Sequence, residues 1–158
     1  MSIQVGDPCP VFSLPNQEGK SISTADFIGN KILVIYFYPK DDTPGCTKEA
    51  CSFRDEHADF EGMGCQVIGI SSDSIASHLQ FATKYKLDFH LLADTQKTAR
   101  KLFGVPGNLF GLIPGRVTYI IDRKGIVRGI YDSMRDAVGH ITEAKNKVKE
   151  LAAEEAVS

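Results

Sequence analysis

Apolar and polar positions follow one another in blocks along the chain, and these blocks predict alternating strands and helices. The nearly unbroken apolar run 32–38 is rich in β-branched and aromatic residues, which is typical of a central strand covered on both faces. A helix over 44–60 and a second buried strand over 67–70 follow it. The later predicted elements are helices over 75–85 and 95–103, strands over 89–92, 117–121 and 126–131, and an amphipathic closing helix over 137–152.

The pattern also predicts the N-terminal segment, one long loop and the inward faces of two helices. Residues 5–14 are extended and proline-rich, and a turn at 16–19 joins them to 21–23, so we expect a hairpin packed at one edge. The loop 104–115 carries large apolar residues between glycines and prolines. We therefore expect it to cover another part of the protein and not to be a solvent-facing linker. The apolar face of the 75–85 helix consists of Ile75, Leu79 and Ala82, and Ala99, Leu102 and Phe103 are expected inward in the 95–103 helix.

The order of the elements predicts an α/β fold of the thioredoxin-like kind, in which one mixed central sheet is sandwiched by helices. Right-handed crossovers after residues 38 and 70 bring both strand ends to the same edge of the sheet. Ligand sites in open α/β sheets usually lie at that edge. We expect one domain over 1–158, with the hairpin as an N-terminal extension.

Composition narrows the class of protein. Hydrophobic residues make up 42% of the chain and charged residues 24%, which is ordinary for a globular protein. A net charge of −2 offers no basic face for nucleic acid and no polybasic membrane anchor. The longest apolar run is far shorter than a membrane helix, and the first residues form no signal peptide, so a cytoplasmic location is expected by default. A processed organellar chain would look the same.

The four cysteines, at positions 9, 46, 51 and 65, include no C-x-x-C pair. The four histidines, at 57, 78, 90 and 140, show no ligand spacing either, so we expect no metal and no cofactor. Cys9 and Cys65 are expected to be small buried residues, and His57 a packed or capping residue. Catalytic or redox-sensing use is the better expectation for the other two cysteines.

The stretch 39–51 is the candidate for that chemistry. Pro39 cannot donate to a sheet ladder, so the strand must end there. Thr43 is a favoured helix N-cap, and Pro44 suits the first helical position. Cys46 is then the third helical residue, on the core-facing side, among backbone N–H groups that lack acceptors. The positive end of the helix dipole favours a thiolate there.

Cys51 cannot reach Cys46 within an intact helix. Five residues of α-helix place it about 140° around and roughly 7.5 Å along the axis from Cys46. A disulfide needs Cα atoms within about 7 Å and converging side chains. If the two cysteines pair, the helix must therefore unwind locally.

The pattern Pro39-x-x-x-Thr43-x-x-Cys46, followed by Glu49 and Cys51, resembles the active site of peroxiredoxins of the Q type, also called bacterioferritin comigratory proteins. The resemblance covers nearly the whole chain. It implies a thiol peroxidase in which Cys46 attacks hydrogen peroxide or an organic hydroperoxide and becomes a sulfenic acid. Cys51 then forms a disulfide with Cys46, which thioredoxin reduces as part of antioxidant defence.

The same resemblance implies roles for neighbouring side chains. Thr43 would hold thiolate and peroxide in line, Arg116 would favour the thiolate and bind the peroxide oxygens, and Glu49 would orient Arg116. The peroxide is expected to bind Pro39, Thr43, Arg116 and Tyr38. Apolar residues expected to line its approach are Phe37, Tyr38, Leu109 and Phe110. Q-type relatives are often monomeric, so a monomer is expected.

Two other functions remain open from the residues alone. A disulfide oxidoreductase would fit the topology, although the absent C-x-x-C argues against it. A redox sensor or holdase would use helix unwinding to alter a partner surface, without peroxide turnover. Cys65 is an alternative resolving partner to Cys51. Thr43 and Arg116 favour the peroxidase, because a sensor needs neither.

Overall fold

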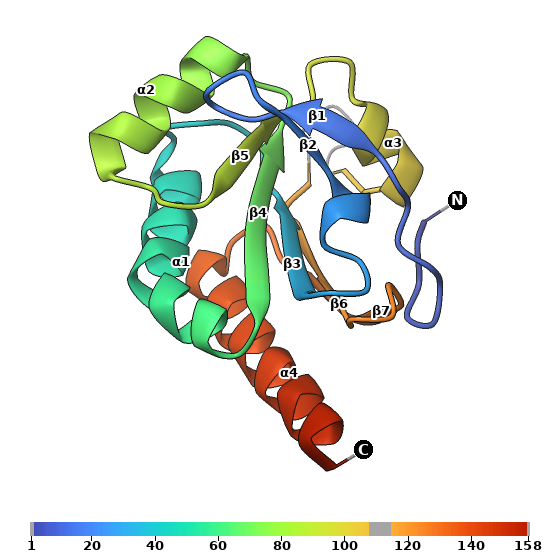
Figure 1. Ribbon diagram of the computed structural model, residues 1–158. Helices are drawn as coiled ribbons and strands as arrows, with labels where there is room; N and C mark the ends of the chain where they lie inside the picture. The colour runs from blue at the N-terminus through green and yellow to red at the C-terminus, as the bar shows by residue number, and fades with distance from the viewer. Residues whose placement is uncertain (1, 108–114, 158) are drawn as a thin grey trace.

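The computed structural model describes residues 2–107 and 115–157, with a five-stranded mixed sheet at its centre (Figure 1). The strand order is β5-β4-β3-β6-β7. Strands β3, β4 and β5 are parallel, whereas β6 and β7 run antiparallel to their neighbours. The bounds are Ile32–Phe37 for β3, Cys65–Ser71 for β4, His90–Ala93 for β5, Val117–Ile121 for β6 and Val127–Asp132 for β7.

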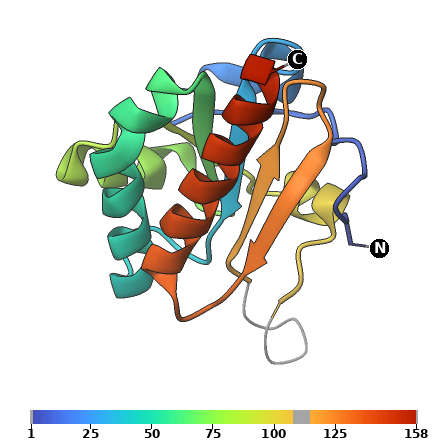
Figure 2. The same cartoon turned by 90° about the horizontal axis from the view of Figure 1, so that it is seen from below.

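Helices cover both faces of the sheet, as the sequence predicts. Figure 2 shows α1 and α4 lying side by side across one face, which α2 also covers. The other face is covered by α3 and the N-terminal segment, and the β1–β2 hairpin lies beside the edge strand β5. The bounds are Pro44–Gly62 for α1, Ile75–Tyr85 for α2, Thr98–Phe103 for α3, Ala137–Val157 for α4, Ser13–Pro15 for β1, Ser21–Ser23 for β2 and Thr24–Asp26 for a short 3-10 helix.

The sheet topology brings two distant parts of the chain together. Strand β3 is buried along its whole length and runs directly into the loop before α1. Strand β6 runs antiparallel to it, with Val117 opposite Phe37. The start of β6 therefore lies at the end of β3, so the residue before β6 meets the first turn of α1.

Two predicted helix faces are only partly right. Ile75 and Leu79 are exposed, because α2 instead turns His78, Phe81 and Ala82 toward the sheet. In α3, Ala99 and Phe103 are buried as expected, but Leu102 is exposed.

Helix α3 begins at Thr98 rather than at residue 95. The buried Asp94 carboxylate accepts hydrogen bonds from the backbone N–H groups of Ala99 and Arg100, at 3.0 and 2.9 Å. These bonds satisfy backbone N–H groups of the first turn of α3 from a residue that precedes the helix.

Among the helices of the described ranges, none is long and apolar enough to cross a membrane.

Candidate active site

The loop after β3 leads into α1 as the sequence predicts, with one difference. Thr43 has the extended backbone of an N-cap residue, and Pro44 occupies the first helical position. The Thr43 side chain, however, makes no capping hydrogen bond. Its hydroxyl donates instead to the Lys40 carbonyl at 2.8 Å, which closes the loop on itself. The predicted capping role of the Thr43 side chain is therefore wrong, although its place at the helix start is right.

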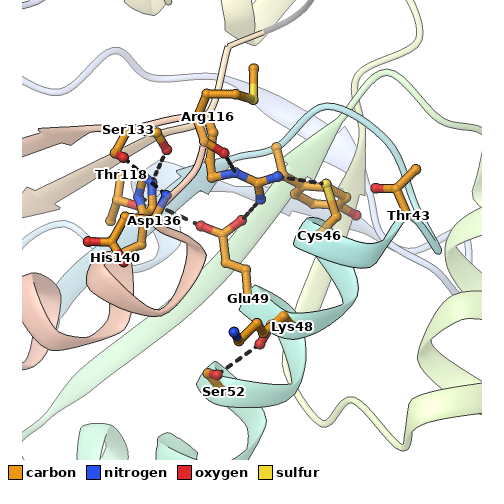
Figure 3. Close-up of polar contacts among 12 residues, drawn as sticks. Thr43, Cys46, Lys48, Glu49, Ser52, Arg116, Thr118, Ser133, Asp136 and His140 are labelled. Carbon is orange, nitrogen blue, oxygen red and sulfur yellow. Dashed lines mark hydrogen bonds and ion pairs between the residues drawn. The ribbon is translucent and has the colours of Figure 1, made fainter.

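Cys46 lies at this end of α1, together with Thr43 (Figure 3). Its residue exposure is only 1%, because it belongs to the core-facing stripe of α1 with Ala50 and Phe53. The first turn of α1 holds no acidic residue, so nothing there opposes the positive end of the helix dipole. The positive end of the α1 dipole is therefore directed toward the Cys46 sulfur.

Arg116, which directly precedes β6, joins Cys46 to Glu49. Its Nη2 lies 3.5 Å from the Cys46 Sγ, and its Nη1 donates to the Glu49 Oε1 at 2.5 Å (Figure 3). Its Nε donates to the Met134 carbonyl at 3.0 Å, so contacts on three sides orient the guanidinium. Burial lowers the pKa of Arg116, but Glu49 and Cys46 raise it by more, so the group stays charged.

Glu49 is fully buried behind Arg116. Burial raises the pKa of its carboxyl group to about 8, even though Arg116 pulls that pKa down. No described hydrogen-bond donor reaches its second oxygen, Oε2. The nearest ring nitrogen, His140 Nδ1, is 3.7 Å from it.

His140 is the residue of this site that sequence reasoning missed. It comes from α4, is fully buried, and lies on the far side of Glu49 from Cys46 (Figure 3). Its Nε2 faces the Ser133 carbonyl at 2.7 Å, and the Thr118 hydroxyl lies 2.7 Å from its Nδ1. A carbonyl only accepts, so Nε2 carries the hydrogen and Nδ1 accepts from Thr118.

Burial lowers the pKa of His140 to about 4, so the ring is neutral near pH 7. A signal for it was present in the sequence, since His140 falls within the apolar stripe of the closing helix. The other members of that stripe are Ala137, Ile141, Ala144, Val148 and Leu151.

The other cysteines lie away from the Arg116 guanidinium that contacts Cys46. In the described part of the chain, all four are free of disulfides. Cys9 and Cys65 are buried, and burial raises the pKa of each thiol to about 12, as suits the small apolar residues that were predicted. Cys51 is half-buried on the continuous helix α1.

The expected peroxide-lining residues have mixed positions. Pro39 and Thr43 are half-buried at the opening of the loop. Tyr38 is 1% exposed and donates its hydroxyl to Asp41, so it supports the loop from beneath. Phe37 belongs to the other side of the sheet, where its ring contacts Phe103. Leu109 and Phe110 lie outside the described residues.

One group of side chains has the arrangement of metal ligands. Asp41, Asp73 and His78 offer ligand atoms that all lie within 4.8 Å of one another. These atoms are already used for hydrogen bonds within the protein, since both His78 Nδ1 and the Ser77 hydroxyl contact Asp41 Oδ2. The group is therefore a hydrogen-bonded network next to the Cys46 loop.

Comparison with known proteins shows the family of the chain. Residues 5–130 match the family model described as the AhpC/TSA family. The chain belongs to the AhpC/TSA family. Within it, the chain is 47% identical over 149 residues to the chloroplastic peroxiredoxin Q of Triticum aestivum, covering 94% of this chain and 68% of the relative. It is 48% identical to that of Arabidopsis thaliana, covering 93% and 68%. This protein is thus a peroxiredoxin of the Q type.

Solved structures show the same fold. Peroxidoxin BcpB from Mycobacterium tuberculosis superposes with a TM-score of 0.87 at 34% identity, covering 94% of this chain and 98% of the other. Peroxiredoxin Q from Xanthomonas campestris superposes with a TM-score of 0.81 at 30% identity, covering 89% and 91%. The predicted thioredoxin-like fold is confirmed, and the activity is that of a thiol-dependent peroxidase, an oxidoreductase acting on peroxide.

The expected cytoplasmic location is contradicted. The relatives from Triticum aestivum, Sedum lineare, Populus jackii and Arabidopsis thaliana are all named as chloroplastic. The cytoplasmic location was expected only because the sequence shows no targeting pattern, and such an absence does not identify a compartment.

Proposed function

We propose that this peroxiredoxin reduces hydroperoxides through Cys46 as the attacking thiolate. The observation that carries the proposal is the buried Arg116, which contacts Cys46 and Glu49 together at the start of α1. The thiolate attacks one oxygen of the peroxide, so that an S–O bond forms as the O–O bond breaks. Cys46 becomes a sulfenic acid, and the leaving oxygen takes up a proton to give water or an alcohol.

Arg116 supports this step in two ways. Its charge favours the Cys46 thiolate before the attack. Its N–H groups then face the position where the leaving oxygen gains negative charge, and preorganised donors of this kind stabilise a transition state strongly. Glu49 and the Met134 carbonyl hold the guanidinium in that orientation.

Thr43 positions the peroxide from the other side of Cys46. Its hydroxyl is free of a capping bond and donates to the Lys40 carbonyl, which leaves the oxygen able to accept from a hydroperoxide O–H. Pro39, also half-buried, completes the opening. Both hydrogen peroxide and organic hydroperoxides are proposed as substrates. The related bacterioferritin comigratory protein of Xanthomonas campestris, at 28% identity, is described by its title as having alkyl peroxide reduction activity.

Cys51 is proposed as the resolving cysteine. Its thiol attacks the Cys46 sulfenic acid, so that a disulfide forms and water leaves. Because α1 is continuous across both positions, its first turns must unwind for this step. Thioredoxin is the proposed reductant of the disulfide, by thiol–disulfide exchange. We also propose that residues 1–158 form one domain and that the protein acts as a monomer, which sedimentation would test.

The test is NADPH consumption with thioredoxin, thioredoxin reductase and hydrogen peroxide. Turnover should vanish in Cys46→Ser, and Cys51→Ser should lose thioredoxin-dependent turnover while still consuming about one equivalent of peroxide. Cys65→Ser is the matched control, with turnover near that of the wild type. Full turnover in Cys51→Ser would contradict the proposed disulfide and move resolution to another thiol.

Arg116→Lys tests the electrostatic part of the proposal. A lysine keeps the charge but cannot contact Cys46, Glu49 and the Met134 carbonyl together, because it lacks the planar fork of donors. We expect the rate constant for Cys46 with peroxide to fall by about 100-fold, as when one oriented donor is removed from a transition state. A wild-type rate in this variant would show that charge alone suffices.

A further inference from the structure

The loop that carries Thr43 is anchored by a second buried network, separate from Arg116. Asp41 lies in this loop and is only 6% exposed. Its carboxylate accepts hydrogen bonds from the Tyr38 hydroxyl at 2.5 Å and from the Ser77 hydroxyl at 2.8 Å. Its backbone N–H donates to the Asp73 carboxylate at 2.9 Å. Asp41 is thus connected to the end of β3, to α2 and to the segment between β4 and α2.

His78 completes the network from α2 and is fully buried. Its Nε2 lies 2.9 Å from the Leu92 carbonyl, which can only accept, so this nitrogen carries a hydrogen. Its Nδ1 lies 2.6 Å from Asp41 Oδ2, which is hydrogen-bond distance. His78 therefore connects the Cys46 loop to strand β5 through groups that water does not reach.

We propose that Asp41 and His78 are positioning residues for the peroxidase reaction, a proposal that rests on the function of Cys46 proposed above. Asp41 directly follows Lys40, whose carbonyl accepts from the Thr43 hydroxyl at 2.8 Å. Fixing Asp41 therefore fixes the Lys40 carbonyl and, through it, the direction of the Thr43 hydroxyl. The hydrogen bonds of Asp41 and His78 go to other groups than the Cys46 sulfur, so both act through Thr43 and not on the peroxide itself.

The chain provides a matched control in the next residue. Asp42 also connects the loop to α2, because its carboxylate accepts from the Lys84 ammonium and the Tyr85 hydroxyl, both at 2.8 Å. These contacts are exposed, and exposed ion pairs contribute little. Asp42 has a φ of +57°, a backbone conformation that asparagine also adopts readily. Asp42→Asn thus makes the same chemical change one residue away without disturbing the buried network.

The experiment compares Asp41→Asn with Asp42→Asn in two reactions of Cys46, without thioredoxin. One is the consumption of stoichiometric hydrogen peroxide, and the other is alkylation by iodoacetamide. Asp41→Asn should slow the peroxide reaction about tenfold or more, because a slightly misplaced group loses alignment with the substrate. Alkylation should change less than about threefold, since it needs a thiolate but no aligned hydroxyl. His78→Gln should behave like Asp41→Asn, and Asp42→Asn like the wild type.

Two results would overturn the proposal. One is a folded Asp41→Asn protein that reacts with peroxide as fast as Asp42→Asn. The other is an equal slowing of both reactions, which would indicate an effect on the thiolate or on the fold. If Asp41→Asn does not fold, Ser77→Ala removes one donor to Asp41 from a half-buried position, and an unchanged ratio of the two rates would then refute the idea. Failure of the proposed function itself would appear earlier, as a wild-type protein whose Cys46 consumes no peroxide.

Discussion

Replacing His140 with glutamine should remove a specific part of the acid sensitivity of this protein. The glutamine amide can still donate to the Ser133 carbonyl, but it does not titrate. It loses the ring nitrogen that accepts from the Thr118 hydroxyl at 2.7 Å. Near pH 7 the variant should therefore be less stable than the wild type by about 1 kcal/mol, the ordinary contribution of one hydrogen bond.

The order should reverse on acidification. Burial lowers the pKa of His140 from 6.5 to about 4, so between these values the unfolded chain binds a proton that the folded chain does not. The free energy of unfolding of the wild type must therefore fall as the pH falls through this window. The difference between the two pKa values corresponds to about 3 kcal/mol once the pH is near 4. Since Glu49 and Arg116 remain in both proteins, most of their contribution cancels in the comparison.

The assay is urea unfolding of the reduced proteins, followed by far-ultraviolet circular dichroism, at several values from about pH 7 to about pH 4. The quantity of interest is the free energy of unfolding of the wild type minus that of His140→Gln. It should start positive and decrease by about 3 kcal/mol over the range. A difference that stays constant with pH would refute the reasoning, because His140 would then hold the same proton folded and unfolded.

Two further predictions concern the space and the thiols around Cys46. In Gly45→Ala, the added Cβ would lie 2.8 Å from Arg116 Nη2, so the guanidinium must move away from the sulfur. We expect peroxide turnover to fall about tenfold or more with an unchanged circular dichroism spectrum. Wild-type turnover would mean that Arg116 can shift without loss of its function. In the native protein near pH 7, brief treatment with iodoacetamide should alkylate Cys46 well before Cys9 or Cys65, as detected by mass spectrometry. Burial raises the pKa of the Cys9 and Cys65 thiols to about 12. Early alkylation of either thiol would contradict that burial.

The candidate nucleophile could be found from sequence because its setting is local. Pro39 ends a strand, Pro44 begins a helix, and Cys46 follows at a fixed distance, so a few backbone rules place the sulfur at a helix N-terminus. The order of elements similarly predicted the mixed sheet, because buried strands and amphipathic helices have distinct hydrophobic periods. The predicted helix faces were wrong where a polar residue is buried, because hydropathy alone does not show that such a residue has a hydrogen-bond partner in the core. The inward face of α2, for instance, is centred on His78 and not on Leu79.

Contacts between distant segments could not be read in the same way. Arg116 lies seventy residues from Cys46, and only the antiparallel pairing of β6 with β3 brings its guanidinium to the sulfur. The resemblance to peroxiredoxins implied that contact, whereas the periodicity of the chain did not. His140 and His78 went unrecognised because a place in the apolar stripe of a helix indicates burial but does not identify the hydrogen-bond partners of a histidine.

The sequence by itself thus determined the elements, the fold class and the position of Cys46 at the start of a helix, since each follows from interactions between near neighbours in the chain. Only the tertiary structure decided which charges meet the sulfur and which buried groups hold them. It enclosed Glu49 between Arg116 and His140, and it fixed the Cys46 loop to α2 through Asp41. The physical reason is that burial and hydrogen-bond partners are properties of the packed chain, and they set the charge and orientation of each group.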